Sequence, residues 1–183
     1  MRKTVLTFGL IAGAVLSVMM LVTIPFIDSI GFDRAEVIGY TTMVLAFLLV
    51  YFGVRSYRDN VAGGSVSFGR AFAVGALIVA VASVCYVATW QIIYYKLTPD
   101  FMGKYQAHVV EQARAKGESQ AAIDKRVAEI QGYVAMYSNP AMNVAITFLE
   151  PLPVGLVFAL VSAGVLRRRS RRGAHAGTVF VAS

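Results

Sequence analysis

Residues 71–95 read AFAVGALIVAVASVCYVATWQIIYY, which is 25 positions without a charged side chain. An α-helix rises about 1.5 Å per residue, so roughly 20 apolar residues cross the ~30 Å hydrocarbon core of a bilayer. This stretch therefore predicts a helix that spans a membrane.

Three other stretches along the chain have a similar length and composition. They are Thr4–Ile27, Val37–Val54 and Met142–Leu166. The second is somewhat short for a span, and the last is interrupted by one acidic residue and two prolines. The pattern predicts an all-α membrane protein with four transmembrane helices, which form a single domain over residues 1–170.

The overall composition supports lipid as the surrounding medium. Hydrophobic residues make up 57% of the chain and the mean hydropathy is +0.65, whereas charged residues make up 15%, against about 25% in soluble domains. The net charge of +7 does not predict a nucleic-acid partner, because five arginines lie in one short tail after the last apolar stretch. The single cysteine, Cys85, allows no internal disulfide and no thiolate metal cluster.

Basic residues are distributed unevenly between the ends of the predicted spans. With the N-terminus placed in the cytoplasm, the cytoplasmic segments hold ten lysines and arginines, while the short loop on the other side holds only Arg34. The positive-inside rule therefore predicts that both termini are cytoplasmic. Residues 171–183 are expected to form a basic, disordered tail. The basic residues expected to anchor the protein at lipid phosphates are Arg70, Arg167, Arg168 and Arg169.

The segment between the third and fourth predicted spans is polar but periodic. Pro99 suits a first helical position, and apolar residues then recur at helical spacing before Gly117. A second series runs from Ile123 to Tyr137 at intervals of three or four. The pattern predicts an extra-cytoplasmic helical hairpin over residues 99–138, whose apolar faces are buried against each other or on the bilayer surface.

An acidic residue followed by two prolines interrupts the fourth predicted span. Pro151 and Pro153 have no amide hydrogen and break the helical hydrogen-bond pattern. The carbonyls of Thr147 and Leu149 should therefore be free beside Glu150. A carboxylate next to free carbonyls at membrane depth is typical of a small cation or proton site. The alternative is a kinked helix in which Glu150 has a local partner on the third span, either Gln91, Tyr94 or Lys96.

Other candidate sites have weaker signals. His108 and Glu111 lie three residues apart, but two ligands do not make a zinc site, so a solvated helix face is the preferred interpretation. No serine or cysteine has a histidine placed to activate it, so we predict no enzyme, no cofactor and no metal. Small residues four apart within a span, such as Gly155 and Ala159, favour packing inside one bundle over a dimer seam.

Several of these stretches together resemble one known family. The run FLEPLPVG at residues 148–155 is similar to a signature of the bacterial family called domain of unknown function 4199. Further similar stretches follow the family's order, at residues 51–55, 67–72, 99–102 with Tyr105, and 137–140. The resemblance covers about residues 2–169. It implies a small inner-membrane protein of four helices with an extra-cytoplasmic helical insertion, and it implies no reaction.

Two functional hypotheses follow from these features. The first is a non-enzymatic structural or partner-binding protein of the bacterial inner membrane, with lipid around its spans and the hairpin as its recognition surface. The second is a small ion- or proton-coupled transporter or channel component that uses Glu150 in a proline-broken helix. Four spans alone enclose little aqueous space, so transport would need a homo-oligomer or an unidentified membrane partner.

Overall fold

The computed structural model describes residues 1–167, and every regular element in that range is a helix. The candidate membrane spans are Arg2–Ile30, Phe32–Asn60, Phe68–Leu97 and Pro140–Leu166, which confirms the four predicted helices. The second span is longer than its apolar stretch, because its helix continues through charged residues at both ends. Arg168, Arg169 and the predicted tail at 171–183 lie outside the described residues.

Only one of the four spans is a single regular α-helix. The second span is α3 (Phe32–Asn60), while the third continues from α4 (Phe68–Ile92) into a π-helical turn, η2 (Ile93–Leu97). The other two spans are divided near prolines, so that each can change direction partway along its length. Their parts are α1 (Arg2–Thr23), η1 (Ile24–Phe26) and α2 (Ile27–Ile30) in the first, and α7 (Pro140–Leu149) and α8 (Leu152–Leu166) in the fourth.

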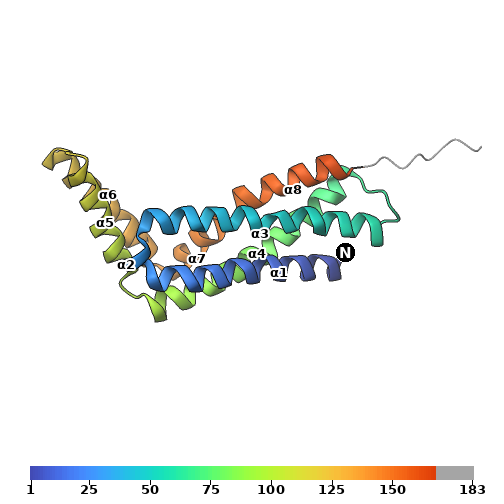
Figure 1. Ribbon diagram of the computed structural model, residues 1–183, viewed down its shortest axis with the longest axis horizontal. Coiled ribbons are helices and arrows are strands. Elements are labelled where there is room, and N and C mark those ends of the chain that lie inside the picture. Colours follow the sequence, from blue (N-terminus) through green and yellow to red (C-terminus); the bar gives the residue numbers. More distant parts are fainter. Residues whose placement is uncertain (168–183) are drawn as a thin grey trace, which may run out of the picture.

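Helix α4 is the centre of the bundle and packs against α1, α3 and α8 (Figure 1). The side chains of Phe47, Ile78 and Val79 are completely enclosed between these helices. Small residues set the closest approaches: a Cβ added to Gly9 would lie 2.7 Å from the Cβ of Val81, and one added to Gly155 would collide with Val79. The small-residue stripes therefore serve packing within one chain.

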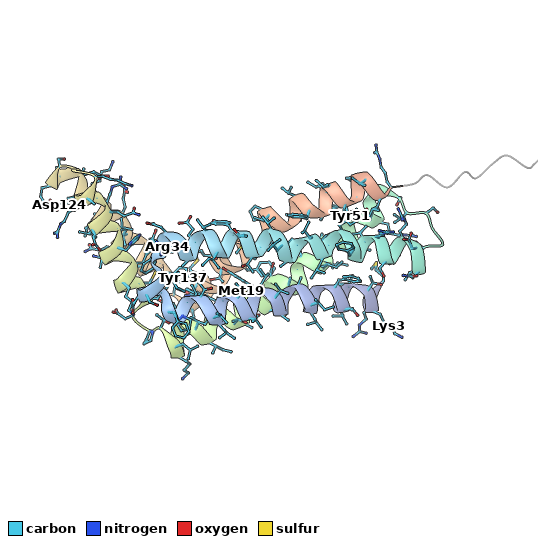
Figure 2. The ribbon with its side chains drawn as sticks, viewed as in Figure 1. Lys3, Met19, Arg34, Tyr51, Asp124 and Tyr137 are labelled. Atoms are coloured by element: carbon cyan, nitrogen blue, oxygen red, sulfur yellow. The ribbon has the colours of Figure 1, made fainter. Side chains whose placement is uncertain are left out.

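The segment between the third and fourth spans forms the predicted hairpin. Its helices are α5 (Phe101–Ala115) and α6 (Gln120–Tyr137), joined at Gly117 with φ of 70°. Pro99 precedes α5 instead of starting it, because Asp100 is the N-cap. The hairpin leans away from the bundle axis (Figure 1), with Tyr137 near the bundle and Asp124 at the tip (Figure 2).

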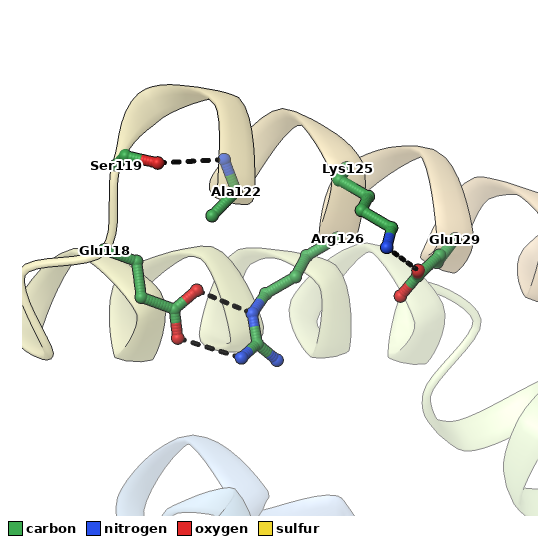
Figure 3. Close-up of polar contacts among 6 residues, drawn as sticks. All are labelled: Glu118, Ser119, Ala122, Lys125, Arg126 and Glu129. Atoms are coloured by element: carbon green, nitrogen blue, oxygen red, sulfur yellow. Dashed lines mark hydrogen bonds and ion pairs between the residues drawn. The ribbon is translucent and has the colours of Figure 1, made fainter.

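The hairpin tip is held together by polar contacts on its surface. The Arg126 guanidinium donates to both carboxylate oxygens of Glu118, at 2.7 and 2.8 Å (Figure 3). The Ser119 hydroxyl accepts from the amide of Ala122 and caps α6. Figure 1 shows the N-terminus and the end of α8 together at the opposite end of the bundle. We call the part of the bundle around α8 the terminal half, and the part around α2, α7 and the hairpin the hairpin half.

A single glycine separates the first two spans. Gly31 has φ of 85° and ψ of 145°, a backbone conformation that is nearly restricted to glycine, and it lies between α2 and α3. No heavy atom lies within 4 Å of the position that its Cβ would occupy. The backbone conformation, and not a lack of space, therefore accounts for glycine at this joint.

Candidate functional site

The fourth span is broken at Glu150 and Pro151. Helix α7 begins at Pro140, where the Asn139 side chain caps it by accepting from the amide of Ala141 at 2.9 Å. It ends at Leu149, and the carbonyl of Pro151 accepts the amide of Gly155 to begin the next helix. Because prolines lack the amide hydrogen that would continue α7 into α8, the two segments are free to take different directions.

The break separates two packing environments. Helix α8 packs against both α3 and α4, whereas α7 packs mainly against α4 and α6. A cavity of about 730 Å³ lies beside the first turns of α3. Residues of α1, α3, α4 and α7 form its walls, and α5 and α6 cover it from the hairpin side.

The walls of this cavity combine aromatic, acidic and apolar side chains. Eight of the lining residues are phenylalanine, tyrosine or tryptophan, and three are carboxylic acids, Asp33, Glu36 and Glu150. No lysine or arginine is among the lining residues in the described part of the chain. The cavity therefore has an acidic and aromatic interior.

Glu150 lies among tyrosines in this cavity. Its carboxyl group interacts with the Tyr86 hydroxyl of α4, and its charge acts on Tyr133 and Tyr137 of α6. Within residues 1–167 no lysine or arginine forms an ion pair with Glu150. The third-span side chain that influences Glu150 is therefore Tyr86, although the two form no hydrogen bond of standard geometry, and it is not one of the three residues considered from the sequence.

Those three residues have other positions. The Gln91 amide donates to the Asn143 side chain at 2.8 Å, which ties α4 to α7. Tyr94 packs edge-on against Tyr137, and Lys96 is exposed. Sequence spacing identified the span that lies beside Glu150, but it did not identify which turn of that span lies at the same depth.

The two residues expected to offer free carbonyls differ in environment. Thr147 is buried, and its hydroxyl forms a hydrogen bond of 3.1 Å with the hydroxyl of Tyr137. Leu149 is 60% exposed and lines the cavity beside Glu150. The structure thus places Thr147, Leu149 and Glu150 at the end of α7, where the Thr147 hydroxyl is bonded to that of Tyr137.

Burial affects the tyrosines of the hairpin. The pKa of Tyr137 is raised to about 12, mainly because burial removes the hydroxyl from water; the charges of Tyr133 and Glu150 contribute to this rise, and the bond to Thr147 opposes it. The pKa of Tyr133 is also raised, first by burial and then by the charge of Glu150. Both side chains therefore remain neutral hydroxyl donors at ordinary pH.

Trp90 is a further polar group in the cavity wall. It is 7% exposed, and its ring packs edge-on against Phe101 of the hairpin at 5.0 Å between centroids. Within residues 1–167 its buried indole N–H forms no hydrogen bond of standard geometry, although it lies close enough to the Tyr137 hydroxyl to influence the pKa of that group. Buried N–H groups usually have a partner, so this position has an unused donor.

A set of polar contacts fastens α5 to the bundle, and we call it the clasp. Lys104 pairs with Asp28 of α2, while Asp33 of α3 accepts from the Gln112 amide at 2.8 Å and contacts His108 at 3.2 Å. The His108 ring stacks on Phe32, with ring centroids 5.0 Å apart.

The clasp corrects the interpretation of His108 as part of a solvated helix face. The ring is half-buried against the bundle, and its neighbour is Asp33 of another span instead of Glu111. A sequence signal was available, because residues 104, 108 and 112 recur at intervals of four and share one helix face. Spacing alone could not show that Asp28 and Asp33 are the partners of this helix face.

Comparison with known proteins reveals one family. The family model described as protein of unknown function (DUF4199) matches residues 7–168. The chain belongs to this family. The match confirms the resemblance seen in the FLEPLPVG run and covers the hairpin and the four spans of the DUF4199 protein, except for the first residues of the first span.

No curated protein and no solved structure matches this DUF4199 chain. The family description carries no activity, so the geometry of the cavity is the basis for any functional argument. The anchors predicted for the DUF4199 protein that the structure describes are Arg70, near the start of α4, and Arg167, at the end of α8; both are exposed.

Proposed function

We propose that this protein is a non-enzymatic binding component of a membrane, which recognises its ligand or partner with the hairpin and the cavity beneath it. The observation that carries the proposal is the position of the cavity. It lies in the hairpin half alone, between spans that are closely packed in the terminal half. A ligand can therefore be held at this end without a passage through the protein.

The packing of the terminal half favours binding over transport by a single chain. Phe47, Val50 and Ile78 are fully buried and fill the centre of the bundle beyond the cavity. An ion that crosses a membrane needs a continuous path lined by polar groups or water. These apolar side chains would have to move apart, or several copies would have to assemble, to create one.

The chemistry of the lining supports a non-enzymatic role. The only histidine among the described lining residues, His108, contacts Asp33 and stacks on Phe32. That lining includes neither serine nor cysteine, so an imidazole-activated nucleophile of the usual kind has no candidate there. The residues serve better as contacts for a bound molecule than as an acid–base pair.

The single tryptophan provides a direct test of an accessible cavity. The full chain would be placed in nanodiscs of phosphatidylcholine with brominated acyl chains, which quench tryptophan on contact. Because Trp90 lies in the cavity wall, we expect partial quenching although its side chain is buried.

The reference for full lipid contact is the double variant Trp90→Phe with Phe52→Trp, since Phe52 is 50% exposed on the outside of α3. We expect Trp90 to be quenched less than this reference but clearly above the level in unbrominated lipid. Fluorescence of Trp90 that does not respond to bromine would show that the cavity is closed to lipid-borne molecules and would overturn the proposal.

The second candidate function is a cation or proton site at Glu150. It is supported by the placement of this carboxylate at a helix break, where intramembrane acids are functional suspects. Proteoliposomes would be assayed for proton and potassium flux with the wild type, Glu150→Gln and the matched exposed variant Glu129→Gln. Flux that is lost only in Glu150→Gln would support this candidate, and flux equal to that of empty liposomes in all three would exclude it.

We also propose that the protein lies in the bacterial inner membrane with both termini in the cytoplasm and the hairpin outside it. The distribution of charge supports this orientation: Arg2, Arg55 and Arg70 belong to the terminal half, whereas Asp28 and Asp33 belong to the hairpin half. Protease protection of tags placed at each terminus in inside-out vesicles would test it. Tags on opposite faces would contradict it.

A further inference from the structure

We propose that the cavity binds an amphiphile with an ammonium headgroup, which lies among Glu36, Glu150 and the tyrosines while the apolar tail extends along α7. The inference rests on the proposed binding function and names the chemical class of the ligand. Four independent properties of the cavity support it: its charge, its aromatic walls, an unused hydrogen-bond donor and its apolar side.

The charge of the cavity is complementary to a cation. Of its three carboxylic acids, Asp33 is engaged by His108 and Gln112, whereas Glu36 and Glu150 form no ion pair within residues 1–167. Both side chains have exposed surface, so each carboxylate is free to contact a cation that enters the cavity from outside the protein. A bound cation supplies the positive charge that the described lining lacks.

The aromatic walls suit an ammonium group in particular. An ammonium ion is attracted to the faces of tyrosine and tryptophan rings when it lies within about 6 Å of the ring centroid. Tyr133 and Tyr137 stack at 5.5 Å between centroids, and Trp90 packs across Tyr137 at 6.5 Å. These rings line the same cavity as Glu150, whose charge reaches Tyr133 and Tyr137, so an ammonium group could contact the carboxylate and the aromatic faces together.

The unpaired indole N–H of Trp90 indicates that the ligand also has a hydrogen-bond acceptor near its ammonium group. It is a buried donor in the wall of the cavity, close to the tyrosines that surround Glu150. An ester, hydroxyl or phosphate oxygen next to the ammonium group would supply the missing acceptor. The ligand is therefore expected to have an oxygen within a few bonds of its cationic nitrogen.

The remaining wall suits an apolar tail. It includes Met19 and Met20 of α1, whose flexible thioethers adapt to irregular ligands, and Ile146 and Leu149 of α7. Leu149 is 60% exposed, so the tail can continue past it toward the bilayer. The volume of about 730 Å³ falls in the range of pockets for small organic ligands, about 300–1,000 Å³.

The test uses Trp90 fluorescence in nanodiscs of phosphatidylglycerol, a lipid without an ammonium group that could occupy the cavity in place of the probes. The probes are dodecyltrimethylammonium, dodecanol and dodecanoate, each with bromine at the same terminal carbon. We expect saturable quenching by the ammonium probe at a concentration about tenfold lower than for dodecanol, which corresponds to ~1.4 kcal/mol. The reference variant Trp90→Phe with Phe52→Trp corrects for the partition of each probe into lipid.

Variants identify the groups responsible for the preference. Glu36→Gln combined with Glu150→Gln should reduce the tenfold preference to about twofold or less, while Glu129→Gln, the same change on an exposed hairpin position, should retain it. Unbrominated dodecyltrimethylammonium should also reverse quenching of the wild type, which tests the site without a variant. A preference that persists in the double variant would overturn the assignment of the carboxylates.

The outcomes distinguish the inference from the function on which it rests. Equal saturable quenching by all three probes would overturn the ammonium preference and leave an accessible binding cavity in place. Quenching that follows only partition into lipid, with no saturation for any probe, would overturn both.

Discussion

The terminal half and the hairpin half of the bundle are built from the same four spans but are held together differently. In the terminal half, helices approach at Gly9, Gly75 and Gly155, and the centre is mainly apolar, with Ser162 as a buried polar side chain of α8. In the hairpin half, aromatic contacts and hydrogen bonds such as Gln91–Asn143 join the helices around open volume. Lipid gives helices no hydrophobic reason to associate, so close packing holds one half and polar contacts hold the other.

The largest expected effect tests the close packing of the terminal half. Gly155→Val should reduce the free energy of unfolding by roughly 3 kcal/mol, because the added side chain overlaps Val79 and Phe47. The control is Gly164→Val on the same helix, where no heavy atom lies within 4 Å of the new Cβ. Unfolding by dodecyl sulfate in mixed micelles measures both variants, and equal losses would show that the terminal half is not tightly packed.

A prediction of intermediate size concerns the burial of Tyr137 in the hairpin half, which should make the free energy of unfolding depend on pH. An unfolded tyrosine ionises near pH 10, whereas Tyr137 keeps its proton in the folded state until about pH 12. The unfolded state therefore loses this proton first as pH rises, and the free energy of unfolding should fall by about 2 kcal/mol between pH 10 and 12. Below pH 10 the residue contributes no pH dependence.

The measurement for Tyr137 is unfolding by dodecyl sulfate at several alkaline pH values, together with tyrosinate absorbance. Tyr137→Phe should flatten the decline of stability between pH 10 and 12, while Tyr95→Phe, which removes an exposed tyrosine, should not. An identical decline in all three proteins would show that Tyr137 is accessible to water.

The smallest expected effect tests the clasp. Asp33→Ala removes the acceptor shared by His108 and Gln112, and because Asp33 is an exposed side chain the expected loss is about 1 kcal/mol. Amide hydrogen exchange in α5 should accelerate by about fivefold, with α4 and α8 unchanged. Asp124→Ala at the hairpin tip is the matched control, since Asp124 contacts only Gln120 of its own helix. Faster exchange throughout the bundle would mean that the two halves do not open separately.

The four spans and the hairpin could be predicted from the sequence because each produces a pattern that extends over many residues. An uncharged run of 25 residues and a series of apolar residues at helical spacing each contain many positions that agree. The end of α7 at Leu149 could also be predicted, because proline has no amide hydrogen and interrupts the helix at its own position in the sequence.

The cavity could not be predicted in the same way. It depends on the direction that α7 takes at the break, and on Glu36 of α3 meeting Tyr86 and Trp90 of α4 there. Hydropathy assigns each of these residues to a span but does not fix the rotation of one helix against another. The clasp was missed for the same reason, because His108 and Asp33 are 75 residues apart.

Gly31 links the placement of the hairpin to a single backbone position. The two carboxylates that hold α5, Asp28 and Asp33, lie on either side of this glycine, one on each of the helices that it joins. A change in the Gly31 dihedral angles would separate the paired attachment points and tilt the hairpin, without disturbing Phe47 or Ile78 deep in the bundle. Changes in the short connection at Gly31 would thus alter the direction of the hairpin in relatives of this protein, while the packing of the membrane spans stays the same.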